Sequence, residues 1–383
     1  MLIKAFPVKQ EPGKERLPLA HSLLVAVSFL LAFVARTGSA ETAAPADLST
    51  WGLHCFCIDA VRTPQRIVRL DNNGQILYRA RTGVTKQGLL EAGLGVTDSQ
   101  LSLMLEYRLL RKDGDTFNTA FPVLGSEEMS VLRPKLDVLA ARITPILAAD
   151  VRAIAKVLRD EGFVDATYAV VFGYVLDGLL WDELSARRLL PSTKLTLERP
   201  QWNGAFWSIY PERVGVAGTN EVESDNVALV FTWTNRVSEA LRSLENAPQL
   251  PEFLRGIADV STRPAVLLGS DKKEWQLASD QGVLRVPVIR QRTGDPIFDR
   301  GARIASQIAR ILAEDTDAGT ILASVDNATR EEAMLIVAHE LIWDIGAQLE
   351  TKKIIRRPAV LSDGDMSAEA LRSLLFVRIR SAS

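Results

Sequence analysis

The chain has 383 residues, of which 47% are hydrophobic and 24% charged, and its formal net charge at neutral pH is −2. This is the composition of a globular protein with ample apolar material for a core, and it excludes a low-complexity chain. The mildly acidic balance also disfavours nucleic acid as a partner, because clustered Lys and Arg supply most of that affinity.

The first 40 residues have the order of a signal peptide. Lysines precede a 13-residue apolar run at 23–35, and small residues follow it up to Ala40. This pattern predicts cleavage after Ala40 and export to the periplasm or the cell surface. Two alternatives stay open: a mis-assigned start or buried helix, and an uncleaved membrane anchor over 17–35. Only in the last case would the chain contact a membrane, through that segment.

Residues 41–84 are predicted to be a linker followed by a β segment, with a strand over 51–61. This strand contains both cysteines of the chain, Cys55 and Cys57, beside His54. Three such soft ligands could hold zinc or copper, but a structural zinc site needs four ligands and the sequence suggests no fourth. We therefore favour a buried strand with core cysteines, and we expect neither a metal nor another cofactor.

A β-hairpin is predicted over 66–81. Two short apolar segments flank Asp71-Asn72-Asn73-Gly74, whose residue types are those of a tight turn between strands.

The segment 85–124 combines a helix, a turn, a second helix and a hairpin. Thr97 begins the second helix, and Gln100 completes a capping box with it. A turn over 111–115 then joins two expected strands. This order resembles the winged-helix superfamily over about 40 residues, a resemblance of fold that implies no particular activity.

Charge argues against DNA binding by this segment. Between residues 85 and 124, five acidic side chains face four basic ones. DNA-binding proteins normally add phosphate-binding Lys and Arg around the residues that contact bases. A transcription regulator with tandem winged helices is therefore kept as an alternative function, and a structural or protein-docking module is the other reading.

One block of the chain occurs twice. In each copy a Pro-Val pair begins a helical stretch that ends in Trp-Asp, and the span from proline to tryptophan is 59 positions in one copy and 56 in the other. Such regularity predicts an internal duplication. The residues that define the repeat are Trp181, Asp182, Trp343 and Asp344.

Helical periodicity is clearest within the two copies. Thr329 and Glu332 form a capping box at the start of the last helix. Pro134 and Pro145 should break the first helix, because proline removes a backbone donor and clashes with the preceding turn. The expected helices span 127–161, 167–186, 297–314 and 329–350.

The predicted class is α+β, with two winged-helix-like, helical halves that flank a β-rich insert. The expected divisions are the signal or anchor 1–40, the linker and β segment 41–84, the first half 85–199, the insert 200–250 and the diverged second half 251–383.

The carboxyl groups of the two Trp-Asp pairs are candidates for general acid–base catalysis. A neighbouring indole lowers the local polarity, and such surroundings can prepare a carboxyl group for general acid–base catalysis, so a hydrolase acting through Asp182 or Asp344 is one hypothesis. The equal positions in both copies favour a repeated structural contact instead, and the chain has no serine-hydrolase, nucleotide-binding or zinc-protease motif. We therefore assign no catalytic residue and keep the hydrolase as an alternative.

The insert is the favoured ligand site. It is rich in aromatic and β-branched residues and holds three of the seven tryptophans. Stacking rings with polar anchors suit a sugar, a peptide or another small molecule, and sites often lie between domains. We predict an exported, non-catalytic binding or interaction protein with an unidentified small-molecule, peptide or protein partner. The candidate ligand-binding residues are Trp202, Asn203, Trp207, Tyr210, Asn220 and Trp233.

Overall fold

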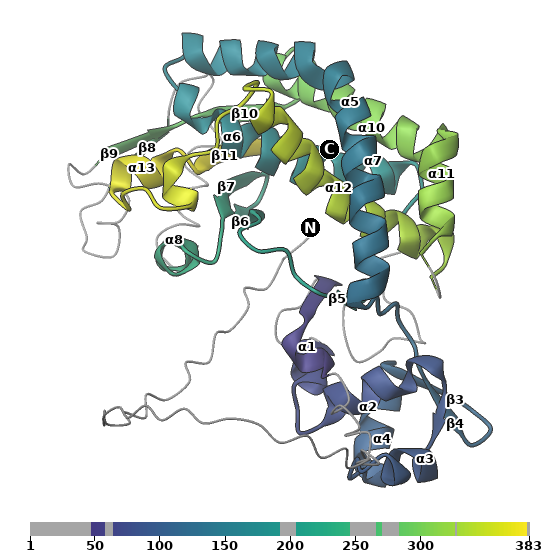
Figure 1. Cartoon of the computed structure of the whole chain (residues 1–383). Coiled ribbons are helices and arrows are strands. Elements are labelled where there is room, and N and C mark those ends of the chain that lie inside the picture. Colours follow the sequence, from purple (N-terminus) through teal and green to yellow (C-terminus); the bar gives the residue numbers. More distant parts are fainter. Residues whose placement is uncertain are drawn as a thin grey trace, which may run out of the picture.

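The computed structural model describes residues 47–57, 64–191, 204–245, 266–269, 283–325 and 328–380. The predicted signal or anchor therefore lies outside the described residues. Helices make up 58% and strands 16% of the structure, which agrees with the predicted mixture of helix and sheet. Figure 1 shows a small N-terminal module below a larger body in which helices surround a sheet.

The N-terminal module, residues 64–121, has its own core. Its elements are α1 (Pro64–Val68), α2 (Asn73–Arg79), η2 (Ala80–Thr82), β2 (Val84–Thr85), α3 (Lys86–Glu91), α4 (Asp98–Glu106), β3 (Leu110–Asp113) and β4 (Thr116–Thr119). The strands form an antiparallel sheet in the order β2-β4-β3. The core side chains of the module include Leu77, Leu89, Met104, Leu109 and Phe117.

The predicted hairpin over 66–81 is wrong, because α1 and α2 occupy this segment. Ile76 and Leu77 are adjacent in sequence and both fully buried, which a two-faced strand would not allow. Asp71 and Asn72 form the bend between the two helices instead, and Asn73 and Gly74 begin α2. There Asp71 adopts a left-handed conformation with φ 48°, and the buried Asn73 side chain donates to the Ile67 carbonyl over 2.8 Å.

The helices and hairpin predicted within 85–124 are present as α3, α4, β3 and β4. The capping box of α4 is also confirmed, since the Gln100 amide nitrogen donates to Thr97 and the Gln100 side chain accepts from the Thr97 amide. The resemblance to the winged-helix superfamily stays a prediction.

Helix α5 (Ser126–Asp160) is continuous, so the predicted breaks at Pro134 and Pro145 are wrong. Both prolines lie on the exposed side of the helix. The opposite face is packed along its whole length, and that packing holds the helix together where each proline removes one backbone hydrogen bond. The buried face includes Leu132, Leu136, Leu139, Ile143, Leu147, Val151, Ile154 and Leu158.

A helical segment in the middle of the body changes its winding along its length. It comprises η3 (Val164–Ala166), α6 (Thr167–Ala169), the π-helix η4 (Val170–Leu179) and α7 (Leu180–Ala186). By length and composition, Val164–Ala186 could cross a membrane, but 78% of its most apolar window is buried inside the protein. It packs as a core helix against α10 (Pro296–Glu314), α12 (Arg330–Thr351) and the sheet.

The helices predicted over 297–314 and 329–350 are confirmed as α10 and α12, and Thr329 and Glu332 form the predicted capping box. The short helix α11 (Thr316–Ala323) joins them. The remaining helical elements of the described residues are η1 (Leu48–Thr50), α8 (Ser238–Glu245), η6 (Ala359–Leu361) and α13 (Ala368–Arg372).

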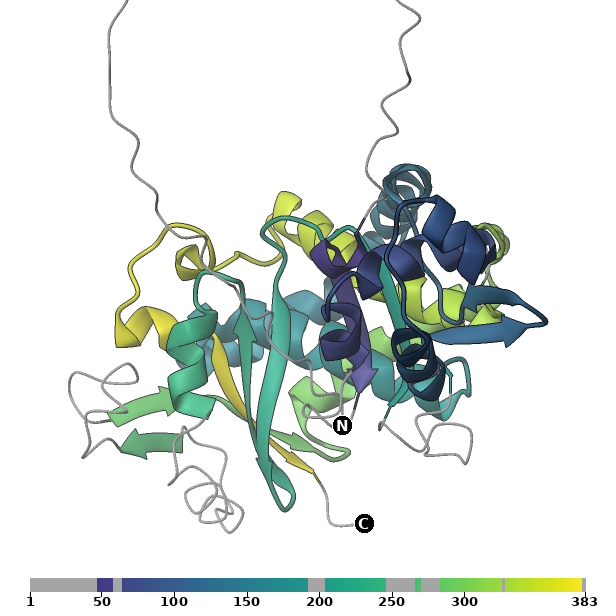
Figure 2. The ribbon, with the colours of Figure 1, turned by 90° about the horizontal axis from the view of Figure 1, so that it is seen from below.

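The main sheet has the strand order β10-β11-β7-β6, with β10 and β11 parallel and the other pairs antiparallel. In Figure 2 this sheet is seen from below, with the N-terminal module to one side of it. Its strands are β6 (Gly218–Ser224), β7 (Val227–Trp233), β10 (Val288–Gln291) and β11 (Leu375–Arg380).

Two further strand pairs complete the described structure. Strand β1 (Gly52–Cys57) pairs with β5 (Gly204–Tyr210), and β8 (Val266–Gly269) pairs with β9 (Val283–Val286). The segment 200–250 is rich in strands as expected, and its strands enter two different sheets. The internal duplication and its two similar halves stay predictions.

Candidate functional site

A cavity of about 100 Å³ lies between the π-helix and the main sheet. Residues from η4 and α7 form one wall, and residues from β6, β7, β10 and β11 form the other. Segments that are far apart in the sequence therefore meet at one place. Short π-helical stretches are frequent at functional sites, which makes this cavity the first candidate.

The winding of the π-helix arranges the helix wall. Its i→i+5 hydrogen bonds widen the helix, so side chains four positions apart stay nearly in line. The Nε1 atom of Trp181 donates to Oδ1 of Asp177 over 3.0 Å. One row of wall residues is Gly173, Asp177 and Trp181, and the neighbouring row is Tyr174, Gly178 and Asp182.

Gly173 allows the helix to lie directly on the sheet. A Cβ atom at this position would be 2.8 Å from Oγ1 of Thr232 and 3.3 Å from Oγ1 of Thr219. Beside it, the edge of the Tyr174 ring meets the Phe376 ring, with the centroids 5.9 Å apart. The glycine and this ring pair hold the two walls at a fixed distance from each other.

The sheet wall carries buried charge. Phe376, Arg378 and Arg380 alternate on the cavity side of β11. Arg378 stands opposite the small Ala228 of β7, so its side chain reaches across β7, and Nη2 lies 2.7 Å from Oε2 of Glu221 on β6.

Arg380 continues this ion-pair network along the strand. Its Nη1 atom lies 2.7 Å from Oε1 of Glu223, which is also 3.9 Å from Nη2 of Arg378. The network joins β11 to β6 across the strand between them.

Some buried polar groups at this wall have hydrogen-bonding capacity to spare. Among the described residues, no partner bonds to Nε of Arg378 or to the hydroxyl groups of Thr219 and Thr232. Arg378 is only 6% exposed. A buried guanidinium N–H normally has an acceptor, because leaving it unmatched is costly. This Nε atom is itself buried, so it is an unmatched donor within the wall and is not open to the cavity.

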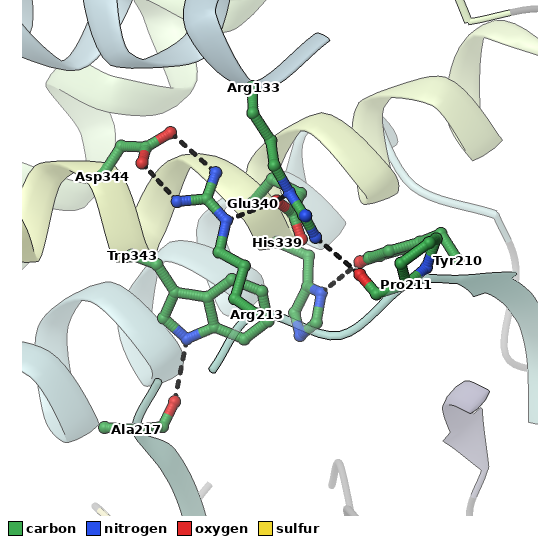
Figure 3. A network of polar contacts seen from close by, with 9 residues as sticks. All are labelled: Arg133, Tyr210, Pro211, Arg213, Ala217, His339, Glu340, Trp343 and Asp344. Atoms are coloured by element: carbon green, nitrogen blue, oxygen red, sulfur yellow. Dashed lines mark hydrogen bonds and ion pairs between the residues drawn. The ribbon is translucent and has the colours of Figure 1, made fainter. Parts of the chain in front are cut away.

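A second polar cluster lies on helix α12 and is shown in Figure 3. Arg213 makes two bonds to Asp344, of 2.5 Å from Nη1 and 3.1 Å from Nη2, and its Nε lies 2.7 Å from Oε2 of Glu340. Arg133 of α5 donates from Nε to the same Glu340 oxygen over 2.9 Å and from Nη2 to the Pro211 carbonyl. We call Arg133, Arg213, Glu340 and Asp344 the α12 ion cluster.

Electrostatics in this cluster follow from burial and pairing. Burial raises the pKa of Asp344 above its ordinary value, and the hydrogen bond and charge of Arg213 only partly oppose this. For Arg213, burial acts to lower the pKa, but the hydrogen bond to Asp344 and the charge of Glu340 raise it overall. Arg213 binds both oxygens of Asp344, so this pair connects the segment after β5 to α12. The Asp344 carboxylate is therefore not available for proton transfer.

An aromatic cluster adjoins the ion cluster. The His54 ring of β1 stacks on Tyr210 of β5 at 4.0 Å, and the Tyr210 hydroxyl lies 2.6 Å from Nδ1 of His339. His339 also lies 4.4 Å from the Trp343 ring and 6.4 Å from Trp181, which lines the cavity. Burial raises the pKa of Tyr210 well above its usual value, so this hydroxyl keeps its proton.

The predicted ligand-binding residues have different neighbours in the structure. Trp202 and Asn203 lie outside the described residues, and Trp207 pairs with Cys55 across β5 and β1. Tyr210 belongs to the aromatic cluster. Asn220 borders the cavity, and its Oδ1 accepts from Nε1 of Trp233 over 3.2 Å.

The two Trp-Asp pairs also differ from each other. Nε1 of Trp343 donates to the Ala217 carbonyl over 2.8 Å, whereas Trp181 donates to a carboxylate. Asp344 is locked in the ion cluster. Asp182 is exposed at the cavity, with the Gln291 amide 3.5 Å from its Oδ2.

Within the part of the chain that the structure describes, no group of three or more His, Cys, Asp and Glu side chains is arranged to hold a metal ion. His54 stacks on Tyr210, and the side chains of Cys55 and Cys57 lie outside the described atoms.

The reading of the sequence missed Gly173, Arg213 and Arg378. Two signals were present for the cavity: glycines at 173 and 178 inside an apolar helix, and arginines at 378 and 380 in an otherwise apolar strand. Arg213 has no comparable signal, because its partners are more than a hundred positions away in the chain.

No family model matches the sequence, and neither a curated protein nor a solved structure is similar enough to indicate a relationship. What the protein binds is therefore inferred from the geometry of the cavity and the clusters beside it.

Proposed function

We propose that the protein is an exported, non-catalytic binding protein that holds a small polar molecule in the cavity between the π-helix and the sheet. The observation that carries this proposal is the charged lining of the cavity, to which the helix wall contributes the exposed Asp182 and the sheet wall the half-buried Arg380. A polar ligand would form charge-assisted hydrogen bonds with these two side chains.

The size of the cavity limits the ligand. At about 100 Å³, the cavity is several times the roughly 10 to 15 Å³ that one water needs, so a small molecule fits inside it. The proposed ligand is therefore a single small metabolite-sized molecule.

The carboxylates support binding better than hydrolysis. Asp344 is held at both oxygens by Arg213, and it lies outside the cavity lining. Asp182 does line the cavity, but a general base also needs a nucleophile and an oriented substrate bond. Recognition of charge is the simpler role for Asp182.

Export is part of the proposal and rests on the signal-like pattern of residues 1–40. Mass spectrometry of the protein made in a Gram-negative host tests it directly. We expect a mature N-terminus just after Ala40 in the periplasmic fraction. An intact Met1 on soluble protein in the cytoplasm would overturn export without touching the cavity.

Binding is tested by thermal unfolding of the purified protein with a panel of small amino acids, amines, carboxylates and polyols. We expect at least one class to raise the melting temperature of the wild type. Gln291→Trp, at the edge of the cavity, should abolish that shift. Gln87→Trp, on the exposed surface of α3, is the matched control and should retain it.

The binding proposal fails if no member of the panel stabilises the wild type. It also fails if Gln291→Trp and Gln87→Trp respond to the active compound in the same way.

A second candidate, DNA binding by the N-terminal module, has one observation in its favour. The order α2, β2, α3, α4, β3, β4 places a helix-turn-helix before a hairpin, as the winged-helix resemblance implies. Against it, Asp98 at the start of α4 pairs with Lys86, with Nζ and Oδ1 2.7 Å apart, which neutralises a cation there. Fluorescence anisotropy with random duplex DNA over a salt series tests it, and the absence of salt-sensitive binding would exclude it.

A further inference from the structure

The segment between β5 and β6, which we call the 211–217 loop, is fixed to the body at its two ends. Nη2 of Arg133 donates to the Pro211 carbonyl over 2.6 Å, and Nε1 of Trp343 donates to the Ala217 carbonyl over 2.8 Å (Figure 3). The two donors belong to the long helices α5 and α12. Both ends of the loop therefore have fixed positions on these helices.

The middle of the loop is held as well. Arg213 binds the carboxylates of Glu340 and Asp344 on α12, and Nη2 of Arg357 donates to the Gly215 carbonyl. Gly215 has a φ of 71°, a conformation that glycine adopts without strain and that lets the chain turn here. Contacts at 211, 213, 215 and 217 hold the loop along its whole length.

Val214 stands at the turn of this fixed loop. Its relative exposure is 102%, the highest of the exposed large hydrophobic residues in the described part of the chain. A fully exposed aliphatic side chain gains free energy when an apolar environment covers it. Because the loop is already ordered, that gain is not spent on fixing its backbone. Val214 is therefore well placed to anchor a contact.

A basic turn lies beside the loop, at the end of α12. It consists of residues 352–357 and holds four basic residues, Lys352, Lys353, Arg356 and Arg357. Arg357 joins the turn to the loop through its bond to the Gly215 carbonyl. The side chains of Lys352, Lys353 and Arg356 are exposed and form no ion pair with the described residues. They are available to an anionic partner.

Acidic residues of the same segments do not cancel this charge. Glu212 of the loop is exposed, and Glu350 in the last turn of α12 is half-buried. Burial raises the pKa of Glu350, which the charge of Arg357 opposes. Arg213 is already balanced within the α12 ion cluster. Four basic residues against these two acidic ones leave the surface of loop and turn with a net positive charge.

A protruding aliphatic side chain beside free basic side chains suits the surface of an anionic bilayer. Attachment to a membrane surface usually takes two signals, and an apolar group combined with basic residues is one such pair. A second copy of the chain suits this surface less, because the basic turns would face each other across a two-fold contact. A protein interface normally buries about 800 Å² on each side around an apolar centre, whereas here one valine protrudes.

We infer that the protein docks on an anionic lipid bilayer, with Val214 inserted among the head groups and Lys352, Lys353 and Arg356 on their phosphates. This inference goes beyond the proposed function and is independent of the cavity and its ligand. The contact also does not use the apolar segment at 17–35.

Co-sedimentation of the purified protein with lipid vesicles tests the inference. One set of vesicles is phosphatidylcholine alone, and in the other phosphatidylglycerol replaces about a third of the lipid. We expect binding to the anionic vesicles that weakens as salt is added, because salt screens the attraction between exposed charges. Binding to the neutral vesicles should be at least about fivefold weaker, the contribution of one basic residue near an anionic surface.

Two variants assign the contact to its residues. Val214→Ser removes the apolar group and should weaken binding to the anionic vesicles at least about fivefold. The double substitution Lys352→Gln and Lys353→Gln removes two of the free charges and should weaken it by at least the same factor. This second variant should also reduce the salt dependence, which the loss of an apolar side chain alone would not do.

Matched controls remove the same kinds of group from the N-terminal module. Leu90→Ser changes an exposed leucine of α3, and the double substitution Arg66→Gln and Arg69→Gln removes two exposed charges at α1. Both controls should bind like the wild type. If they weaken binding as much as the variants at 214 and 352–353, overall composition and not this surface drives attachment, and the inference is overturned.

Two other results would overturn it as well. Equal binding to neutral and anionic vesicles would assign the attachment to the apolar segment at 17–35. Absence of binding to the anionic vesicles at low salt would exclude the contact altogether. In each case the proposed ligand-binding function stands, because its thermal assay is carried out without lipid.

Discussion

The Tyr210 hydroxyl lies 2.6 Å from Nδ1 of His339, and both side chains are buried. This bond ties the end of β5, on which His54 of β1 stacks, to the middle of α12. A buried hydroxyl needs such a partner, because its burial without a hydrogen bond is unfavourable. The pair therefore fixes the β1–β5 ribbon on the body.

Tyr210→Phe should lower the free energy of unfolding by about 1 kcal/mol, the net value of a typical hydrogen bond, and slightly more if His339 is left unmatched. Urea unfolding followed by tryptophan fluorescence measures the change. Tyr78→Phe on the half-buried face of α2 is the control and should shift stability by less than about 0.5 kcal/mol. Equal effects of the two substitutions would argue against a structural role of the Tyr210–His339 bond.

Glu340→Gln should be far more damaging. Glu340 is fully buried, and its Oε2 accepts from both Arg133 and Arg213. Removing its charge leaves two guanidinium groups with less compensation, and breaking such a buried pair costs about 3 to 5 kcal/mol. Chemical denaturation should show this loss.

Glu369→Gln is the comparison for that experiment. Glu369 pairs with Arg372 at the surface, with its side chain 70% exposed, so the cost should stay within about 1 kcal/mol. If the two substitutions prove equally mild, the α12 ion cluster does not hold the body together.

Gly173→Ala tests the contact between the π-helix and the sheet. The new methyl group would be 2.8 Å from Oγ1 of Thr232, and this overpacking should cost about 1 to 3 kcal/mol. Thr232→Ala should relieve part of that cost in the double mutant. Gly319→Ala in α11 has open space around it and should stabilise the protein by about 0.5 to 1 kcal/mol through helix propensity. Additive effects of the substitutions at 173 and 232 would contradict the proposed contact.

The elements that the sequence predicts well are those with local signals. The capping boxes at Thr97 and Thr329 and the apolar periodicity of α10 and α12 are all short-range patterns, and the structure has them. The predictions failed where tertiary packing outweighed a local sequence preference. Tertiary packing keeps α5 helical through its prolines, and burial of Ile76 and Leu77 turns an expected hairpin into helices.

The candidate site was harder to predict for a physical reason. The ion pairs in the cavity wall depend on the order of the strands in the sheet. Arg378 on β11 reaches Glu221 on β6 because β7 is the one strand between them. Residues 157 positions apart carry no local pattern that joins them. Asn220 was singled out from its strand and does border the cavity, but the tryptophan platform proposed around it depended on contacts that sequence spacing does not specify.

The two capping boxes allow a test of how independently the two cores open. Thr97→Ala should destabilise the N-terminal module by about 1 kcal/mol, and Thr329→Ala should do the same to the body. Hydrogen exchange should show faster exchange in α3, α4 and β4 for the first variant and in α12 for the second, because the two regions have separate core clusters. Identical exchange profiles in the two variants would instead indicate one cooperative unit.

The ion pairs of Asp150 join α5 to α10, and we expect this contact to weaken in acid. The hydrogen bond from Arg303 lowers the pKa of Asp150 most, with burial opposing it and Arg300 adding to it. The folded pKa therefore lies below the unfolded one, so the unfolded state takes up the proton first as pH falls.

This stabilisation is complete above the ordinary value of 3.8 and is lost as pH falls through the folded pKa. Asp150→Asn should cost about 1 kcal/mol at pH 7 and at pH 5, and the difference from the wild type should shrink at pH 3. Urea midpoints at the three pH values measure it. A difference that stays constant down to pH 3 would show that the Asp150 charge does not stabilise the contact between the two helices.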